Sequence, residues 1–260
     1  RECVNSPLVL EDGRYRMDLD DMEQKIREHD VKLFILCSPH NPVGRVWTKD
    51  ELAAAGWLCE KYDVIVVSDE IHSDFTYGGL IHTVFPSISP QLAERTILCT
   101  APSKTFNLAG MLFSNIIIRD EEERNRFQDR DKNIGAANPL SVAAHKAAYQ
   151  HGGRWLSELK EYIDESFKMV DRFLKENIPQ ARFTVPEATY FAWVDMSRVL
   201  PDVEDLPLFF ANNSGVLLEG GDGLFVDNAK GYIRLNLAMP RATIEEGLRR
   251  MAEAIEKHNR

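Results

Sequence analysis

Three polar residues, Asn41, Asp69 and Lys104, each follow an apolar segment in the first half of the sequence. Such segments are typical of buried strands, and ligands of open α/β sheets bind at the carboxyl ends of the strands. An amide, a carboxylate and an amine at three such ends can serve one ligand. We therefore expect these three residues to belong to one site.

Lys104 lies in a polar loop, where a lysine is more often solvent-exposed than chemically active. Lys104-Thr105 also resembles the end of a nucleotide-binding P-loop. That loop needs glycines immediately before its lysine, so that backbone amides can surround the phosphates. Here Ala101, Pro102 and Ser103 hold those positions, and the sequence excludes a P-loop.

Asp69 has two interpretations. A strand-terminal aspartate is often a turn or capping residue. Alternatively, it is a buried carboxylate that faces a cationic ring nitrogen. Pyridoxal 5'-phosphate (PLP) requires such a partner, because the protonated pyridinium is what lets its ring accept electrons. Each residue alone is weak evidence, whereas the ordered combination favours the second interpretation.

The elements that must position these residues alternate between helix and strand over residues 1–152. This alternation predicts an α/β domain with a largely parallel sheet. A long helix, Trp155–Asn177, then leads into a smaller α+β domain, so that residues 153–260 form the second domain. Its strands are predicted at Arg182–Val185, Tyr190–Asp195, Gly215–Leu218 and Tyr232–Leu237.

The composition is that of an ordinary globular protein, with 44% hydrophobic and 28% charged residues among 260. The formal charge of −10 argues against nucleic acid as a partner. We expect no membrane segment, because no apolar run has transmembrane length. Cys3, Cys37, Cys59 and Cys99 lack metal-ligand spacing. We therefore predict no metal site, and free thiols in a reducing cytoplasm.

Four motifs link the candidate residues. They are Asn41-Pro42-Val43-Gly44, Ser68-Asp69-Glu70-Ile71-His72, Ala101-Pro102-Ser103-Lys104-Thr105-Phe106-Asn107-Leu108-Ala109-Gly110 and Ile233-Arg234-Leu235-Asn236. In order and spacing they resemble fold-type-I PLP enzymes of the class I/II aminotransferase superfamily. Within it, the chain looks most like the MalY/PatB group of cystathionine β-lyases (C–S lyases), which includes cystalysin. The resemblance covers essentially the whole chain.

The resemblance implies PLP as cofactor and a role for each matched residue. Lys104 would bind PLP as a Schiff base and later move the Cα proton, while Asp69 would pair with the pyridine nitrogen. Asn41 would donate a hydrogen bond to the ring hydroxyl oxygen. Arg234 would bind the substrate α-carboxylate, a task that suits its planar fork. A surface arginine is the alternative, but apolar neighbours indicate a buried strand.

Thr100 and Ser103 are candidates for hydroxyl contacts to the cofactor phosphate, with a plain loop role as the alternative. Two departures favour a lyase over a transaminase. Leu112 stands where many aminotransferases of the superfamily have a phosphate-binding arginine. His72 stands where many have a tyrosine at the ring oxygen. It is either a neighbour of that oxygen or a structural histidine.

We therefore expect β-elimination from a cysteine-type amino acid, which yields a thiol, pyruvate and ammonia. An aminotransferase is the nearest alternative, and a non-catalytic regulatory relative is the second. The family implies a homodimer. The chain begins at Arg1 rather than at Met. We expect the family's phosphate-cradling loop and ring-stacking aromatic residue to precede Arg1, so the large domain is predicted to lack its N-terminal part.

Overall fold

The computed structural model describes residues 2–130, 137–226 and 228–260. These form two compact units. The parallel-sheet unit comprises Met17–His40 and Arg45–Lys160. The C-terminal unit comprises Asn41–Gly44, Glu161–Arg260 and the N-terminal segment that ends at Arg16. The domain limits 1–152 and 153–260 remain a prediction.

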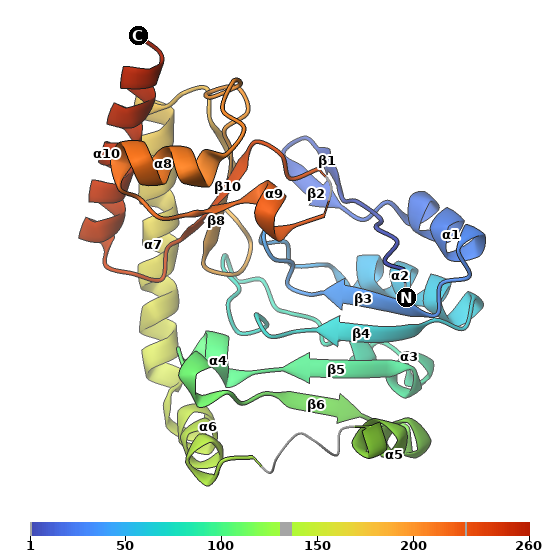
Figure 1. Ribbon diagram of the computed structural model, residues 1–260. Coiled ribbons are helices and arrows are strands. Elements are labelled where there is room, and N and C mark those ends of the chain that lie inside the picture. The colour runs from blue at the N-terminus through green and yellow to red at the C-terminus, as the bar shows by residue number, and fades with distance from the viewer. Residues whose placement is uncertain (1, 131–136, 227) are drawn as a thin grey trace. The chain divides into compact units, whose positions relative to one another are not determined.

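The parallel-sheet unit alternates strands and helices, as the sequence predicts. Its elements are α1 (Leu19–Glu28), β3 (Leu33–Cys37), α2 (Lys49–Lys61), β4 (Ile65–Asp69), η1 (Phe85–Ser87), α3 (Pro90–Glu94), β5 (Thr96–Thr100), α4 (Pro102–Thr105), η2 (Ala109–Met111), β6 (Asn115–Ile118), α5 (Glu121–Arg130), α6 (Pro139–His151) and the first residues of α7 (Gly153–Asn177). The strands lie in the order β3-β4-β5-β6, and Figure 1 shows β6 running opposite to the other three.

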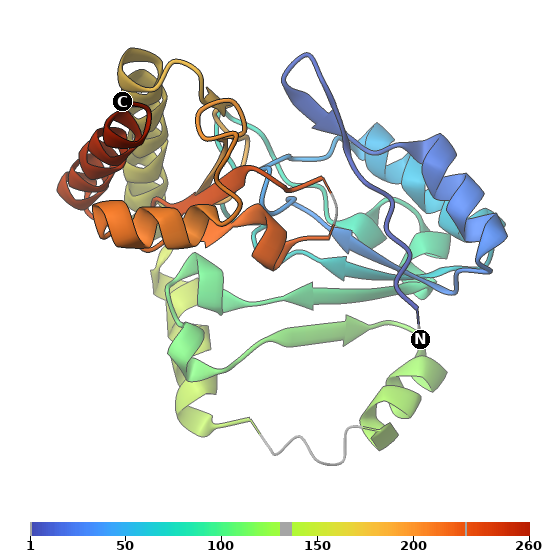
Figure 2. The same cartoon turned by 45° about the horizontal axis from the view of Figure 1, so that its top comes forward.

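Helices α1 and α2 lie on one side of this sheet, where apolar side chains of helix and strand are buried. Figure 2 shows α1 and α2 next to each other on the same side of the strands. Leu52 and Cys59 of α2 and Val66 of β4 are fully buried, which removes their apolar surface from water. A capping box opens α2: the Thr48 hydroxyl accepts the Glu51 N–H, and the Glu51 carboxylate accepts the Thr48 N–H.

The C-terminal unit is an antiparallel sheet with helices. Its elements are β1 (Val9–Glu11), β2 (Arg14–Arg16), the rest of α7, β7 (Arg182–Phe183), β8 (Phe191–Asp195), α8 (Leu206–Ser214), β9 (Glu219–Gly220), α9 (Gly221–Leu224), β10 (Tyr232–Asn236) and α10 (Arg241–His258). Four strands lie in the order β7-β8-β10-β9, and β1 pairs with β2 alone. Phe167 of α7, Val194 of β8 and Ile233 of β10 are fully buried in its core.

The predicted fold class is confirmed: the chain is α/β, with a mostly parallel sheet in one unit and a smaller α+β unit. The predicted strand Gly215–Leu218 is wrong. Gly215 instead ends α8 in the left-handed conformation, with φ of 68° and its N–H bonded to Ala211 O. Strand β9, which pairs with β10 on the side opposite β8, begins only at Glu219.

Gly44 closes the Asn-Pro-Val-Gly motif and has no room for a side chain. Its φ is 68°, and an added Cβ would lie 2.3 Å from Pro186 Cβ and 2.7 Å from Ala188 O. Its carbonyl oxygen accepts the N–H groups of Glu187 and Ala188, both at 2.9 Å. We expect Gly44→Ala to lower the free energy of unfolding by about 3 kcal/mol, measured by urea unfolding of the full-length protein.

Gly78→Ala is the matched control for this prediction. Gly78 also has a positive φ, 63°, but an added Cβ would meet nothing within 4 Å. Its replacement therefore adds only backbone strain, about 1 kcal/mol. Equal losses in the two variants would show that contact with Pro186 and Ala188 contributes nothing at Gly44.

Candidate active site

Asp69 ends β4, and backbone hydrogen bonds to both neighbouring strands fix its position. Its carbonyl oxygen accepts the Ser38 N–H at 2.9 Å, and the Glu70 N–H donates to Cys99 O at 2.9 Å. Oδ1 accepts the Ile71 N–H at 3.2 Å. Burial raises the pKa of Asp69, and the Ile71 bond and the charge of Lys104 oppose that rise. A half-buried carboxylate is thus held at the carboxyl edge of the sheet, within electrostatic reach of Lys104.

Lys104 lies in the single helical turn α4, directly after β5. Pro102 occupies the start of this turn, and the Phe106 N–H closes it on Pro102 O at 2.9 Å. The Leu108 N–H then bonds Ser103 O at 3.1 Å. Since β4 and β5 are parallel neighbours, Asp69 at the end of β4 and Lys104 just beyond β5 lie at the same edge of the sheet.

A hydrogen bond of Thr105, the buried residue after Lys104, holds the α4 turn in place. Thr105 is fully buried, and its hydroxyl donates to Asp74 Oδ2 at 2.7 Å. Burial, together with the negative charge of Asp74, raises the pKa of Tyr149. Burial also lowers the pKa of Lys160, and the charge of Asp74 opposes this. Asp74 was not predicted as a site residue, although it lies only two residues beyond His72.

A second network fixes the chain just beyond Asp69. Glu70 is buried, and its Oε1 accepts the Ser68 hydroxyl at 2.8 Å and the Phe85 N–H at 2.9 Å. Its Oε2 lies 2.5 Å from His82 Nε2. These contacts bind the end of β4 to the segment that opens η1. Glu70 was not predicted as a site residue, because its partners lie up to fifteen positions away.

The remaining predicted residues of this unit lie nearby in the fold. Thr100 ends β5, and its hydroxyl accepts the Asn115 amide at 3.1 Å. Ser103 is the second residue of α4. His72 follows β4 and is buried, with 2% of its surface exposed. Their roles remain predictions.

Arg234 lies in β10 with its side chain 11% exposed. Its Nη1 donates to Asn41 Oδ1 at 2.9 Å, and its Nε donates to Glu219 Oε2 at 2.8 Å. Nη2 donates to the same Glu219 oxygen. The guanidinium also lies over the ring of Phe191, 4.2 Å from its centre. Asn41 and Arg234 therefore meet within the C-terminal unit, whereas Asp69 and Lys104 meet within the parallel-sheet unit.

His40, which precedes Asn41, is held neutral by burial, which lowers its pKa to about 4. Its Nδ1 is buried and has no hydrogen-bond partner among the described residues, and its ring lies edge-on to Trp47. The unfolded chain, with an ordinary histidine pKa, binds a proton more readily than the folded chain between about pH 4 and 6.5. Stability contributed by neutral His40 is present above pH 6.5 and is lost as the pH falls towards 4.

We expect His40→Phe to weaken this acid sensitivity, because phenylalanine keeps a ring against Trp47 and cannot titrate. Between pH 7.5 and 5.0, wild type should lose about 2 kcal/mol more unfolding free energy than the variant. Urea unfolding of both full-length proteins at the two pH values measures the difference. Parallel pH profiles would show that His40 does not cause the loss.

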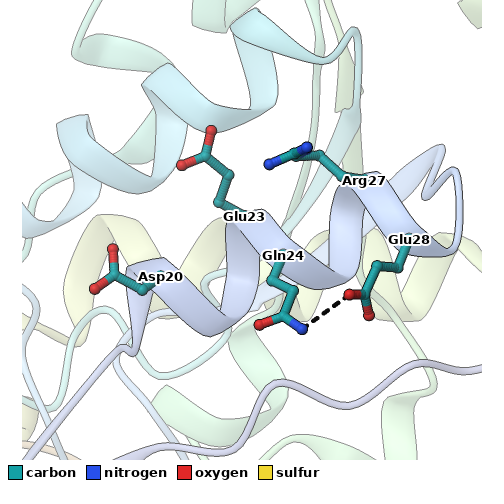
Figure 3. Close-up of a pocket in the computed structure, with 5 residues that line it drawn as sticks. All are labelled: Asp20, Glu23, Gln24, Arg27 and Glu28. Atoms are coloured by element: carbon teal, nitrogen blue, oxygen red, sulfur yellow. Dashed lines mark hydrogen bonds between the residues drawn. The ribbon is translucent and has the colours of Figure 1, made fainter.

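A surface pocket runs along α1 (Figure 3), and none of the predicted site residues lines it. It is lined by Asp20, Glu23, Gln24, Arg27 and Glu28. Its polar groups are partly paired: Gln24 donates to Glu28 at 2.8 Å, and Glu23 accepts from Lys61 at 2.6 Å. We assign no chemistry to it.

In residues 2–130, 137–226 and 228–260, no group of three or more His, Cys, Asp or Glu side chains is placed to hold a metal ion. Across the same ranges, no helix is long and apolar enough to cross a membrane.

The family model for aminotransferase class I and II matches residues 4–251. The chain belongs to this family. It is 39% identical over 257 residues to cystathionine beta-lyase PatB of Bacillus subtilis, covering 98% of this chain and 66% of PatB. The predicted resemblance to the MalY/PatB group is therefore confirmed.

Solved structures of similar proteins confirm the predicted fold type. The PLP-bound C–S lyase of Staphylococcus hominis is 41% identical, with a TM-score of 0.92 over 97% of this chain and 64% of that one. Cystalysin of Treponema denticola, which contains a pyridoxal 5'-phosphate cofactor, is 38% identical, with a TM-score of 0.94 over 99% of this chain and 66% of that one. The chain thus spans slightly less than two thirds of these relatives.

Proposed function

We propose that the protein to which this chain belongs is a PLP-dependent C–S β-lyase. Its substrate would be L-cystathionine or a similar cysteine-type amino acid, and its products a thiol, pyruvate and ammonia. The observation that carries the proposal is the position of Asp69 within electrostatic reach of Lys104 at the carboxyl edge of the sheet. The names of the relatives, cystathionine beta-lyase and C–S lyase, support the same reaction.

The residues present fit PLP. Asp69 is a half-buried carboxylate whose pKa burial raises, and a pyridinium nitrogen beside it would favour the charged form of the carboxylate. Its Oδ2 makes no hydrogen bond to the described residues, so one acceptor is available for the ring N–H. Asn41 would bond the ring hydroxyl oxygen. Thr100 and Ser103 would donate their hydroxyls to the phosphate, and His72 would lie near the ring oxygen.

When bound, PLP supplies an electron sink for the charge that develops at the substrate Cα. Lys104 would hold the cofactor, and its Nζ would remove the substrate Cα proton as a general base. Asp69 keeps a proton on the ring nitrogen. Arg234 binds the substrate α-carboxylate through its planar fork and so fixes the direction of the Cα–H bond.

Pyruvate assays test this proposal and separate it from transamination. The full-length protein should convert L-cystathionine into pyruvate and free thiol in equal amounts. Leu112 supports this outcome over transamination, because it places an exposed apolar side chain where many aminotransferases have an arginine. Glutamate formed from 2-oxoglutarate without pyruvate would instead identify an aminotransferase. Protein that holds no PLP even when supplemented would support a regulatory role.

Assembly and location are also proposed. Resemblance to the family supports a homodimer, which sedimentation of the full-length protein would test. The four cysteines form no disulfide, which supports a reducing cytoplasmic location. The substrate is a small amino acid, and the formal charge of −10 supports the proposal that nucleic acid is not a partner.

A further inference from the structure

The guanidinium of Arg234 is already paired with a carboxylate of the chain itself. Arg234 in β10 and Glu219 in β9 stand directly opposite each other in the antiparallel ladder. Two of the guanidinium nitrogens, Nε and Nη2, donate to one oxygen of Glu219. The Nε/Nη2 edge of the guanidinium, one of the two edges that can receive a ligand carboxylate, is thus occupied within the fold, and Nη1 donates to Asn41.

The two partners of this pair differ in how firmly they are held. The Arg234 side chain is 11% exposed, and contacts with Asn41 and Phe191 hold its guanidinium. The Glu219 side chain is 49% exposed. A buried cation needs a compensating anion, and Glu219 supplies it. Because the Glu219 carboxylate borders solvent, it can leave the pair and become hydrated, whereas Arg234 cannot.

We propose that Glu219 is an internal competitor for the substrate α-carboxylate, a specificity residue that occupies Arg234 until a ligand carboxylate displaces it. This rests on the proposed function, in which Arg234 binds that carboxylate. Two carboxylates on one guanidinium would leave a net negative charge, and their mutual repulsion favours displacement over joint binding. An amino-acid amide lacks the charge to displace Glu219, so the pair selects for a free carboxylate.

The alternative is that Glu219 is a permanent anchor, since oppositely charged cross-strand pairs also stabilise sheets. The two roles predict opposite results for Glu219→Gln, which removes the charge and keeps a hydrogen-bond acceptor. If Glu219 is a competitor, its replacement by glutamine lets carboxylates bind Arg234 more tightly. If Glu219 is an anchor, its replacement by glutamine lets Arg234 move and lowers the affinity for carboxylates.

Propionate is a suitable probe, because it presents a carboxylate and undergoes no turnover. We expect Glu219→Gln in the full-length holoenzyme to bind propionate about fivefold more tightly than wild type, measured by calorimetry. The KM for L-cystathionine should fall by a similar factor, with a smaller change in kcat. Glu204→Gln is the matched control, because it removes the same charge from an exposed glutamate of the same unit and should leave propionate affinity unchanged.

A second pair of variants tests whether the effect of Glu219→Gln on propionate affinity depends on Arg234. In Arg234→Ala, the further change Glu219→Gln should not tighten propionate binding. Circular dichroism and melting temperature confirm that each variant is folded. Unchanged or weaker propionate affinity in folded Glu219→Gln overturns the proposal, as does the absence of propionate binding to both wild type and variant.

The result of the propionate experiment is independent of the result of the lyase assay. If wild type forms no pyruvate while Glu219→Gln tightens propionate binding through Arg234, the proposed reaction fails and the competitor role stands. If pyruvate forms and propionate affinity does not rise in the variant, the reaction stands and the competitor role fails.

Discussion

Replacement of Lys104 by alanine in the full-length protein is expected to lower kcat/KM for L-cystathionine by about 10³- to 10⁴-fold. The variant loses both the amine that holds the cofactor and the base that removes the Cα proton. The fold should survive, because Thr105 and Asp74 anchor the α4 turn through a bond that does not involve the Lys104 side chain. Initial rates of pyruvate formation give the measurement.

Spectroscopy makes this prediction specific to Lys104. Borohydride treatment of wild type followed by peptide mapping should attach the reduced cofactor to Lys104. Lys104→Ala should lose both this adduct and the visible band of lysine-bound PLP. Lys49→Ala is the matched control, because Lys49 is an exposed lysine at the start of α2 and should retain both. A variant at Lys104 with near-normal pyruvate formation would remove this lysine from the mechanism.

Asp69→Asn should lower kcat by about 10²- to 10³-fold while the protein stays folded. Asparagine keeps the shape of the side chain and can still accept the Ile71 N–H. It carries no negative charge, so it cannot hold a proton on the ring nitrogen, and the electron sink weakens. Because burial raises the pKa of Asp69, we also expect cofactor affinity of wild type to fall on acidification, as the carboxylate takes up a proton.

Asp63→Asn provides the control for this change. Its side chain is 99% exposed, and it occupies a left-handed position that asparagine tolerates. Its kcat should match that of wild type. Fluorescence titration with PLP, with and without acidification, compares the cofactor affinity of all three proteins. Equal kcat in Asp69→Asn and wild type would show that the carboxylate charge plays no part in the reaction.

Local sequence patterns predicted much of the fold, because they act over a few residues. The apolar segment before Asp69 is β4, and the long helix predicted at Trp155–Asn177 is α7. The two-residue Asp12-Gly13 hairpin could also have been predicted. Both residues have positive φ, as such turns require.

The failed prediction at Gly215–Leu218 shows where local patterns stop being sufficient. An apolar run after a glycine is compatible with either a strand or the end of a helix. The left-handed conformation of Gly215, which ends α8, decided between them.

The sequence by itself determined the family and the order of the motifs that carry Asp69 and Lys104, because those residues are adjacent to strands with readable patterns. Only the tertiary structure decided the partners of these residues. Three contacts join segments that are 12 to 31 residues apart: the Glu219–Arg234 ion pair, the hydrogen bond from Thr105 to Asp74, and the Glu70–His82 contact. Such pairs depend on strand register and loop path, which arise from packing of the whole unit and leave no local signal in the sequence.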